Sequence, residues 1–430
     1  MIIKNTKDLK IFNFINKEYH INSYLNRLTQ EKNKKFKIKG STVGKLLFIG
    51  MFSREKSLNQ IMEKAHYRKK LKNIFSSKER IPKMHSFRDG IKNLKLKELE
   101  LINKNIIAKS KENKVYRKGS VDGYVVVGID GVECFGSYKK NWNNSYKTKK
   151  KIKKYNGRKK ETIEKEYHKQ INVVAKIVGK RPGLIIGYEK ITCNGKQGKQ
   201  EYEPNVGIKL IKKLKTSYGR GIDVIVGDAI YLREDFLKAL RQEEYVGIIR
   251  LKDNNKCLLE NAEGLFKKQE AKIFKKEKKI VNTNIHSERI IKYWSDIFEY
   301  KNEKVKIVKY EEEYKKGKEH ETEIIYVLCT DLKLKEETIN KIIHARWDIE
   351  NNGFNELKNY WNMKHCYMAD EKAIDIIMQM IIMSYNLWEM YIYGHLHNFA
   401  KKKITKLGYI EKMIELMYLA KKEEINFSSS

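Results

Sequence analysis

The chain is 430 residues long and strongly basic, with 91 Lys and Arg against 54 Asp and Glu and a formal charge of +37. This length allows two or three domains and at least one large core, and the charge excess indicates a polyanionic partner, usually nucleic acid. AT-rich coding also enriches lysine, but the surplus is clustered as well as diffuse, which favours nucleic-acid binding.

The cysteines and the apolar segments exclude several other classes of protein. The cysteine count is five, and no Cys-x-x-Cys pair occurs, which argues against a disulfide scaffold or a zinc ribbon and suits a reducing compartment. The N-terminus has no apolar signal-peptide segment. In the most apolar stretch, Ala373 to Gly394, Asp375 and Glu389 leave an uncharged run shorter than the ~18 residues of a membrane span. We therefore expect a buried core helix here, no membrane partner, and a cytoplasmic protein.

Residues 1–118 have a helical and basic pattern. Val43 to Leu71 carries apolar residues at helical spacing, Ile81-Pro82 marks a break, and Asp89 to Ile107 repeats Ile and Leu every three to four residues. Such a region either binds DNA or packs on the main domain, and no helix-turn-helix pattern decides between the two.

From residue 119 to residue 252, the spacing of the apolar residues indicates strands and helices in alternation. Three strands followed by alternating helix and strand predict a mixed sheet in an α/β domain. The expected strands are Tyr124–Ile129, Ile171–Val178, Leu184–Ile191, Ile222–Val226 and Tyr245–Leu251, and the expected helices are Val206–Leu214 and Leu232–Leu240.

Residues 253–330 hold short strand-like pieces among dense charge, and they predict a β-rich insertion. The pieces are Lys278–Val281, Ile290–Trp294, Val305–Tyr310 and Glu323–Cys329. The helical pattern returns at Glu336 and continues through Trp361, so residues 331–370 are expected to add a helix to the core. Residues 371–430, including Ile410–Lys422, are expected to form a helical C-terminal region.

Three acids stand where a divalent-metal site can form. Asp130 closes the first expected strand, and Asp228 lies outside the carboxyl end of the fourth, where open α/β sheets place ligands. Glu350 lies four residues after Arg346, so on a helix the guanidinium steadies the carboxylate. Each acid has an ordinary alternative: a turn at Asp130-Gly131, a helix cap at Asp228, and a solvated helix face at Glu350.

The three acids together favour a metal site over these alternatives. Mg²⁺ takes oxygen ligands and leaves positions open for phosphate oxygens. A pair of such ions supports displacement at a phosphodiester, and no histidine base is required. The sequence therefore predicts two Mg²⁺ or Mn²⁺ ions held by these carboxylates.

The segment Tyr138–Lys160 contains eleven Lys and Arg and no acid, with aromatic residues between them. It is either a disordered charged loop or a DNA-contacting loop, in which cations bind phosphates and rings stack on bases. Because the segment follows Asp130 so closely, we favour the DNA-contacting loop. The expected phosphate contacts are Lys149, Lys150 and Lys151.

From Val121 to Tyr367 the chain resembles the DDE transposases of bacterial insertion sequences, in the group with a Tyr-x2-Arg-x3-Glu-x6-Lys signature. The resemblance rests on Gly128–Gly131, Val226–Tyr231, Tyr245–Lys252 and Arg346–Lys358. It implies a ribonuclease H-like catalytic domain with a mixed sheet, often with a β-rich insertion between the second Asp and the Glu. That insertion agrees with the charged segment at residues 253–330.

The resemblance also implies roles for individual residues. Asp130, Asp228 and Glu350 would be the catalytic, metal-binding triad, and Arg346 and Lys358 would contact DNA phosphates near the cleaved end. Lys252, at the end of the third block, is expected among the DNA-binding residues.

The implied function is a transposase that cleaves double-stranded DNA at the terminal repeats of its element and joins the freed 3′ hydroxyl to target DNA. Family members usually act as homodimers on paired ends, and a bacterial, nucleoid-associated location is expected. The alternatives are a nuclease on the same fold that cuts without joining, and a non-catalytic DNA-binding protein such as a decayed element copy.

The chain departs from the signature at two places. Ile343 stands at the Tyr position, so the role of that Tyr is missing or is shifted to His344. Seven residues rather than six separate Glu350 from Lys358, which on a regular helix at ~100° per residue turns Lys358 about 80° away from Glu350. A π-bulge absorbs one extra residue, and we predict one at Asn351-Asn352-Gly353 that returns Lys358 to the site.

Overall fold

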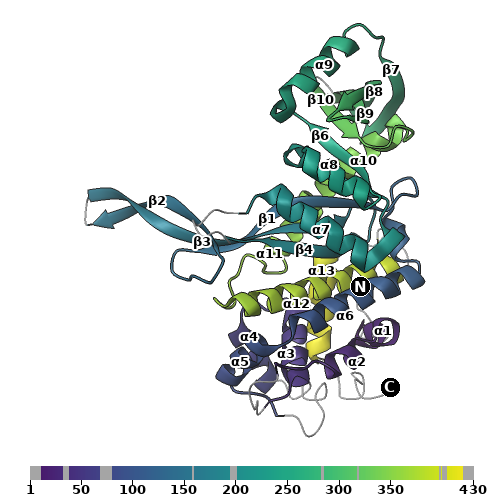
Figure 1. Cartoon of the computed structure of the whole chain (residues 1–430). Coiled ribbons are helices and arrows are strands. Elements are labelled where there is room, and N and C mark those ends of the chain that lie inside the picture. The colour runs from purple at the N-terminus through teal and green to yellow at the C-terminus, as the bar shows by residue number, and fades with distance from the viewer. Residues whose placement is uncertain are drawn as a thin grey trace.

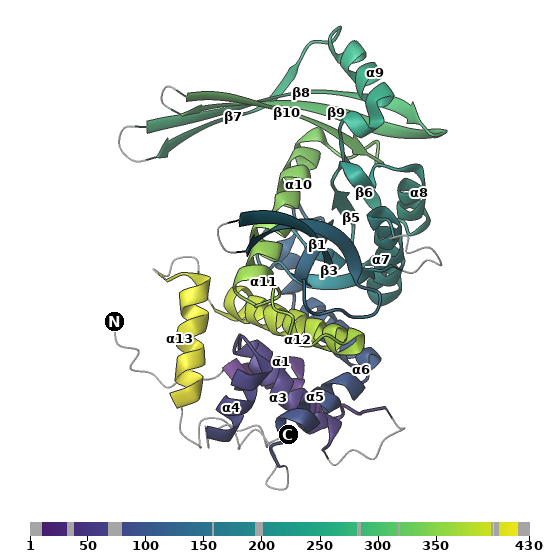
Figure 2. The same ribbon diagram turned by 90° about the vertical axis from the view of Figure 1, so that its left-hand side faces the viewer.

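The computed structural model describes residues 11–31, 38–67, 80–156, 159–193, 201–281, 285–316, 319–396, 399 and 404–419. In these residues, helices cover both faces of one long mixed β-sheet, which continues into a second β-rich region (Figures 1 and 2).

The N-terminal region is helical, as predicted, and its helices pack beneath the sheet and α12 (Figure 1). Each of the two expected helices is divided. The first breaks after residue 52, where Arg54 has a φ of 58°, and residues 68–71 lie outside the described part. The second breaks at Leu94, which has extended backbone. Apolar spacing did not predict these breaks, because neither has a Gly or Pro. The helices are α1 (Ile11–Tyr19), α2 (Ile21–Asn26), α3 (Gly40–Phe52), α4 (Leu58–Tyr67), α5 (Met84–Asn93) and α6 (Leu96–Glu112), followed by the 3₁₀ turn η3 (Tyr116–Gly119).

The core of the sheet has the predicted mixed α/β organisation. Its strands are β1 (Val126–Ser137), β3 (Lys159–Ile177), β4 (Ile185–Ile191), β5 (Val224–Gly227) and β6 (Val246–Leu251), and its crossover helices are α7 (Glu203–Tyr218) and α8 (Glu234–Gln242). β1, β5 and β6 are parallel, whereas β3 runs antiparallel to β1 and β4 antiparallel to β3. The 3₁₀ turns η4 (Gly219–Gly221), η5 (Ala229–Tyr231) and η6 (Asp253–Asn255) join these elements.

Two predictions for the chain around Asp130 were wrong. β1 neither ends nor turns at Asp130-Gly131 but continues to Ser137, paired with β3. The charged segment after it is not a loop, because β2 (Tyr146–Asn156) pairs with the first half of β3 as a hairpin. This hairpin, the arm, projects from the body of the molecule (Figure 1). The lysine-rich strand is accommodated because acids of β3 lie opposite lysines of β2. Lys149, for example, pairs with Glu166, 17 positions along the chain, and Lys151 pairs with Glu164.

The predicted β-rich insertion contains α9 (Lys256–Phe266) and the strands β7 (Lys272–Val281), β8 (Ile285–Tyr300), β9 (Glu303–Lys316) and β10 (Glu319–Cys329). These strands extend the core sheet, since β10 pairs antiparallel with β6 from Tyr326↔Leu251 to Cys329↔Ile248. The strand order is therefore β2-β3-β1-β5-β6-β10-β9-β8-β7, with β4 also paired to β3. In Figure 2 the long strands β7 to β10 cross above the core.

The rest of the chain is helical, as predicted. Its elements are α10 (Glu336–Asp348), the π-helix η7 (Ile349–Phe354), α11 (Asn355–Asn359), α12 (Glu371–Glu389), the π-helix η8 (Met390–His395) and α13 (Lys406–Leu419). The predicted core helix is confirmed, because α12 is buried from Ala373 to Glu389 and packs against α3, α5 and α6. Of the predicted helix Ile410–Lys422, residues 420–422 lie outside the described part. No helix in the described ranges has the length and apolar character that a membrane crossing requires.

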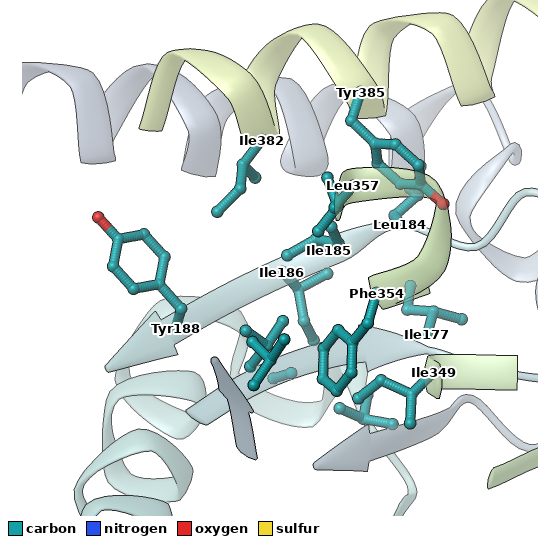
Figure 3. Close-up of a cluster of buried hydrophobic side chains, with 14 of the residues drawn as sticks. Ile177, Leu184, Ile185, Ile186, Tyr188, Ile349, Phe354, Leu357, Ile382 and Tyr385 are labelled. Carbon is teal, nitrogen blue, oxygen red and sulfur yellow. The ribbon is translucent and has the colours of Figure 1, made fainter. Parts of the chain in front are cut away.

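Apolar packing fixes the chain around η7 between the sheet and α12 (Figure 3). Ile349, Phe354 and Leu357 are buried and lie against residues of β3, β4 and α12, such as Ile177 and Tyr385. Each buried side chain of this size contributes about 1.5–3 kcal/mol. The opposite face of η7, which carries Glu350, is exposed as a result.

Candidate active site

Asp130 and Asp228 follow neighbouring residues of two paired strands. Ile129 of β1 pairs with Gly227 of β5, the last pair of that parallel ladder, and each Asp is the next residue along its chain. β5 ends there, which confirms the predicted place of Asp228 at a strand end, while β1 continues past Asp130. The two carboxylates therefore lie where the sheet opens between β1 and β5.

Glu350 meets Asp130 through Arg346. The Nη1 atom of Arg346 donates a hydrogen bond to Oε1 of Glu350 at 2.8 Å and lies 4.0 Å from Oδ2 of Asp130. The predicted i,i+4 contact between Arg346 and Glu350 is thus confirmed. Because the Arg346 side chain is only 6 % exposed, water screens its charge weakly, and the charge acts strongly on nearby carboxylates.

The pKa of Asp130 indicates that negative charge is crowded around Asp130 and Glu350. Burial, followed by the charge of Glu350, raises the pKa of Asp130 to about 7, although Arg346 opposes the shift. Burial also acts to raise the pKa of Asp228, but the Ala229 backbone, Lys252 and Arg346 lower it overall. A cation added beside Asp130 would therefore relieve an unfavourable charge.

These carboxylates have the chemistry that Mg²⁺ and Mn²⁺ prefer, since hard divalent ions take oxygen ligands. Within the described ranges, no three His, Cys, Asp or Glu side chains are close enough together to enclose an ion. The guanidinium of Arg346 instead links Asp130 to Glu350. The chemistry of this donor set therefore fits a divalent metal.

The predicted π-bulge is confirmed. The helix that begins as α10 changes to π geometry over Ile349–Phe354, and the Asn355 N–H donates to the carbonyl of Glu350, five residues earlier. A π-bulge takes up one residue more than a regular turn. The helix α11 therefore has the rotation about its axis that it would have if six residues, rather than seven, separated Glu350 from Lys358.

After the bulge, the charge of Lys358 acts on Cys134 of β1, which is four residues beyond Asp130. Burial raises the pKa of the Cys134 thiol to about 12, and the charge of Lys358 opposes this shift. Lys358 therefore acts on the strand that carries Asp130.

The other predicted DNA-binding residues lie at two places. Lys252 is beside the acids, with its Nζ 3.4 Å from Oδ1 of Asp228. Lys149, Lys150 and Lys151 lie on β2 of the arm, which projects from the body of the molecule (Figure 1). The Nε2 of His344 lies 2.6 Å from Oε1 of the buried Glu312 in β9.

Sequence analysis missed Glu203 and Tyr231. The Tyr231 hydroxyl donates to Oε1 of Glu203 at 2.8 Å, and a side chain at Gly131 would collide with the same carboxylate. Burial raises the pKa of Glu203, whose charge adds to the raised pKa of Asp130. The only local signal was Glu203-Pro204, which is typical of any helix start.

A cavity of about 1070 Å³ opens beside Asp228. Residues after β5 and β6, the start of α8, and the turn between β8 and β9 line it. Cations and rings combined in this way suit a nucleic-acid strand, although three acids also line the cavity. Its cations are Arg233, Lys238, Lys252 and Lys301, and its rings are Tyr202 and Tyr300.

Comparison with known proteins identifies the family. The family described as transposase DDE domain matches residues 134–387, more than half of the chain. The chain belongs to the transposase DDE domain family. The match includes Asp228, Glu350 and Lys358 and begins four residues after Asp130. No curated protein matches the chain.

Family membership confirms the predicted ribonuclease H-like α/β fold. The mixed sheet with helices on both faces is the architecture expected of a DDE transposase domain, and the β-rich strands lie between Asp228 and Glu350 as the resemblance implied.

Proposed function

We propose that this protein is the metal-dependent transposase of a bacterial insertion sequence, in the Tyr-Arg-Glu-Lys group. It cleaves double-stranded DNA at the terminal repeats and joins the freed 3′ hydroxyl to target DNA, as a homodimer on paired ends in the nucleoid. The observation that carries the proposal is that Arg346 links Asp130 to Glu350, beside Asp228, in a chain of this family.

In this proposal Asp130, Asp228 and Glu350 hold two Mg²⁺ or Mn²⁺ ions. When bound, such ions activate the attacking oxygen and stabilise the leaving oxygen of the phosphodiester. Before that, Arg346 neutralises Asp130 and Glu350, which would otherwise repel each other. Once these carboxylates have a metal as counter-charge, the guanidinium is free to bind a DNA phosphate, together with Lys252 and Lys358.

The register of the arm supports a DNA-binding role for one of its faces. Residues directly opposite each other on paired strands share a face, so Lys150 and Lys165 lie together with no acid opposite. The Nζ of Lys150 also lies 3.7 Å from the ring centre of Tyr167. On the other face, by contrast, Lys149 and Lys151 are balanced by glutamates directly opposite.

Replacing Lys150 and Lys165 by Ala is expected to weaken DNA binding more than replacing Lys149 and Lys151, although each pair removes two positive charges. The unbalanced lysines release more counterions, so their loss should lower the log–log salt slope of the association constant by about 2. Titrations of duplex DNA at several salt concentrations measure both effects. Equal losses for the two pairs would contradict the assignment of the face.

The function is tested with a labelled duplex that carries the terminal repeats of the element and a plasmid target, with Mg²⁺ or Mn²⁺ present. Cleavage followed by joining of the 3′ end to the plasmid supports the proposal. Cleavage without joining supports the nuclease alternative, and DNA binding without cleavage supports a decayed copy. Light scattering of the protein bound to paired ends tests the homodimer.

A further inference from the structure

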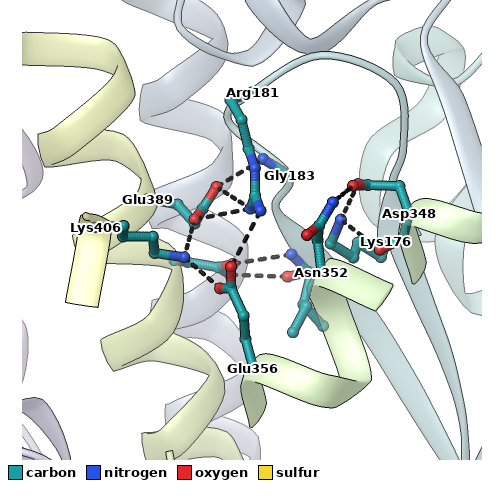
Figure 4. Close-up of polar contacts among 10 residues, drawn as sticks. Lys176, Arg181, Gly183, Asp348, Asn352, Glu356, Glu389 and Lys406 are labelled. Atoms are coloured by element: carbon teal, nitrogen blue, oxygen red, sulfur yellow. Dashed lines mark hydrogen bonds and ion pairs between the residues drawn. The ribbon is translucent and has the colours of Figure 1, made fainter. Parts of the chain in front are cut away.

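Lys176 of β3 is a fully buried lysine beneath the π-helix. Its side chain is 0 % exposed and forms an ion pair with Asp348, the last residue of α10 (Figure 4). Its Nζ also lies 3.4 Å from the backbone carbonyl of Asp348. A buried charge is stable only with partners of this kind, and the pair binds the sheet to the residue that immediately precedes the bulge.

The lysine stem fills the space under the widened turn. A Cβ atom at Gly353 would lie 2.8 Å from Cδ of Lys176, so a glycine is what lets the turn close over the lysine. On β1, Gly128 pairs with Lys176, and a Cβ there would be in ordinary van der Waals contact with Ile349, 3.6 Å from its Cβ. The absence of a side chain at Gly353 allows η7 to approach the sheet closely.

The helix is held on both sides of the bulge. Before it, Asp348 accepts hydrogen bonds from Lys176 and Asn352. After it, Glu356 accepts a hydrogen bond from Arg181 at 3.1 Å and one from Lys406 (Figure 4). Because Asp348 and Glu356 are both held by these partners, the helix takes up the extra residue between these two positions.

We propose that Lys176 is a positioning residue that fixes the place of the π-bulge and, with it, the rotation of Glu350 and Lys358 relative to Asp130. Irregular turns occur where a side chain inserts into the i→i−4 hydrogen-bond ladder of a helix, and Lys176 approaches that ladder at the carbonyl of Asp348. The link to cleavage rests on the proposed function, in which Glu350 serves the reaction.

The direct test is hydrogen exchange of full-length Lys176→Met, followed by mass spectrometry. Exchange in peptides that cover residues 346–358 is expected to rise, while exchange within α12 stays near that of the parent chain. Lys190→Met is the matched control, because Lys190 of β4 also forms ion pairs across to α12, with Asp375 and Glu371, but none with η7. Unchanged exchange over residues 346–358 in Lys176→Met would overturn the proposal, whether or not the chain cleaves DNA.

A second measurement separates positioning from general stability. Lys176→Met is expected to cut end-DNA about 100-fold more slowly with unchanged DNA affinity. A loss of this size is typical when a catalytic group is displaced by ~1 Å.

Deleting Asn351 restores a six-residue spacer between Glu350 and Lys358, which needs no bulge. In that background most of the loss should be recovered, because the two changes act on one feature. If Lys176→Met lowered the cleavage rate equally in the parent chain and in the Asn351 deletion, Lys176 would have a structural role only. Absence of cleavage by the parent chain would contradict the proposed function instead, and the exchange result would still decide the role of Lys176.

Discussion

Asp130→Asn, Asp228→Asn and Glu350→Gln are each expected to abolish cleavage of end-DNA and to leave DNA affinity unchanged. Each substitution keeps the size of the side chain but removes a charged oxygen donor from the site of the divalent ions. The loss should exceed the ~100-fold that removal of an outer-shell partner causes. Gel-based cleavage assays with Mg²⁺ and with Mn²⁺, beside binding titrations without metal, measure the two quantities separately.

Glu133→Gln is the matched control for these variants. Glu133 lies on β1, three residues beyond Asp130, but its carboxylate accepts a hydrogen bond from Tyr167 and lies 3.4 Å from Nζ of Lys169. We expect it to cleave at the rate of the parent chain. Cleavage by all three triad variants at the control rate would remove these acids from the reaction.

Glu389→Gln is expected to destabilise the fold by about 3–5 kcal/mol, as removal of one partner from a buried ion network usually does. Glu389 is fully buried at the end of α12. Its carboxylate accepts hydrogen bonds from Arg181 at 3.1 Å, from the N–H of Gly183 at 2.9 Å, and from Lys406 (Figure 4). The substitution leaves two partly buried cations, Arg181 and Lys406, with less negative charge beside them, and urea unfolding at neutral pH measures the loss of stability.

The same network has a defined dependence on pH. Burial acts to raise the pKa of Glu389, but Lys406 and Arg181 hold it well below the usual 4.5. A depressed pKa contributes stability above the unfolded value, and the contribution is lost as the pH falls through the folded pKa. The difference between the parent chain and Glu389→Gln should therefore be constant above about pH 5 and shrink below it.

Glu371→Gln, on the same helix, provides the comparison. Its side chain is 33 % exposed and pairs with Lys190, so its loss should cost less than about 1 kcal/mol. A similar cost for both variants would show that the buried network does not stabilise α12.

The helices and strands of the core were predictable because neighbouring residues in each of them favour the same type of secondary structure. The β-branched runs at residues 124–129 and 222–226 and the apolar spacing at 206–214 each indicate one type of structure over several residues. The arm was not predictable in this way, since a run such as Lys149-Lys150-Lys151 becomes a strand through acids that occur after residue 160.

The candidate site was predictable to the extent that its residues follow strands or keep a helical spacing. The seven-residue spacer between Glu350 and Lys358 even predicted the bulge, because a helix that must keep two side chains in phase has one way to absorb an extra residue. Lys176 and Glu203 were missed, since Lys176 occupies one position in an apolar strand and Glu203 resembles an ordinary helix start. Their importance depends on contacts with residues far away in the sequence.

The continuous ladder from β6 to β10 has a mechanical consequence. Backbone hydrogen bonds, rather than a flexible linker, join the outer strands β7 to β9 to the strands that carry Asp130 and Asp228. A sheet of this kind resists hinge motion in its own plane, so the outer strands cannot swivel freely. A partner bound to these outer strands would therefore be held at a fixed distance from Asp130 and Asp228.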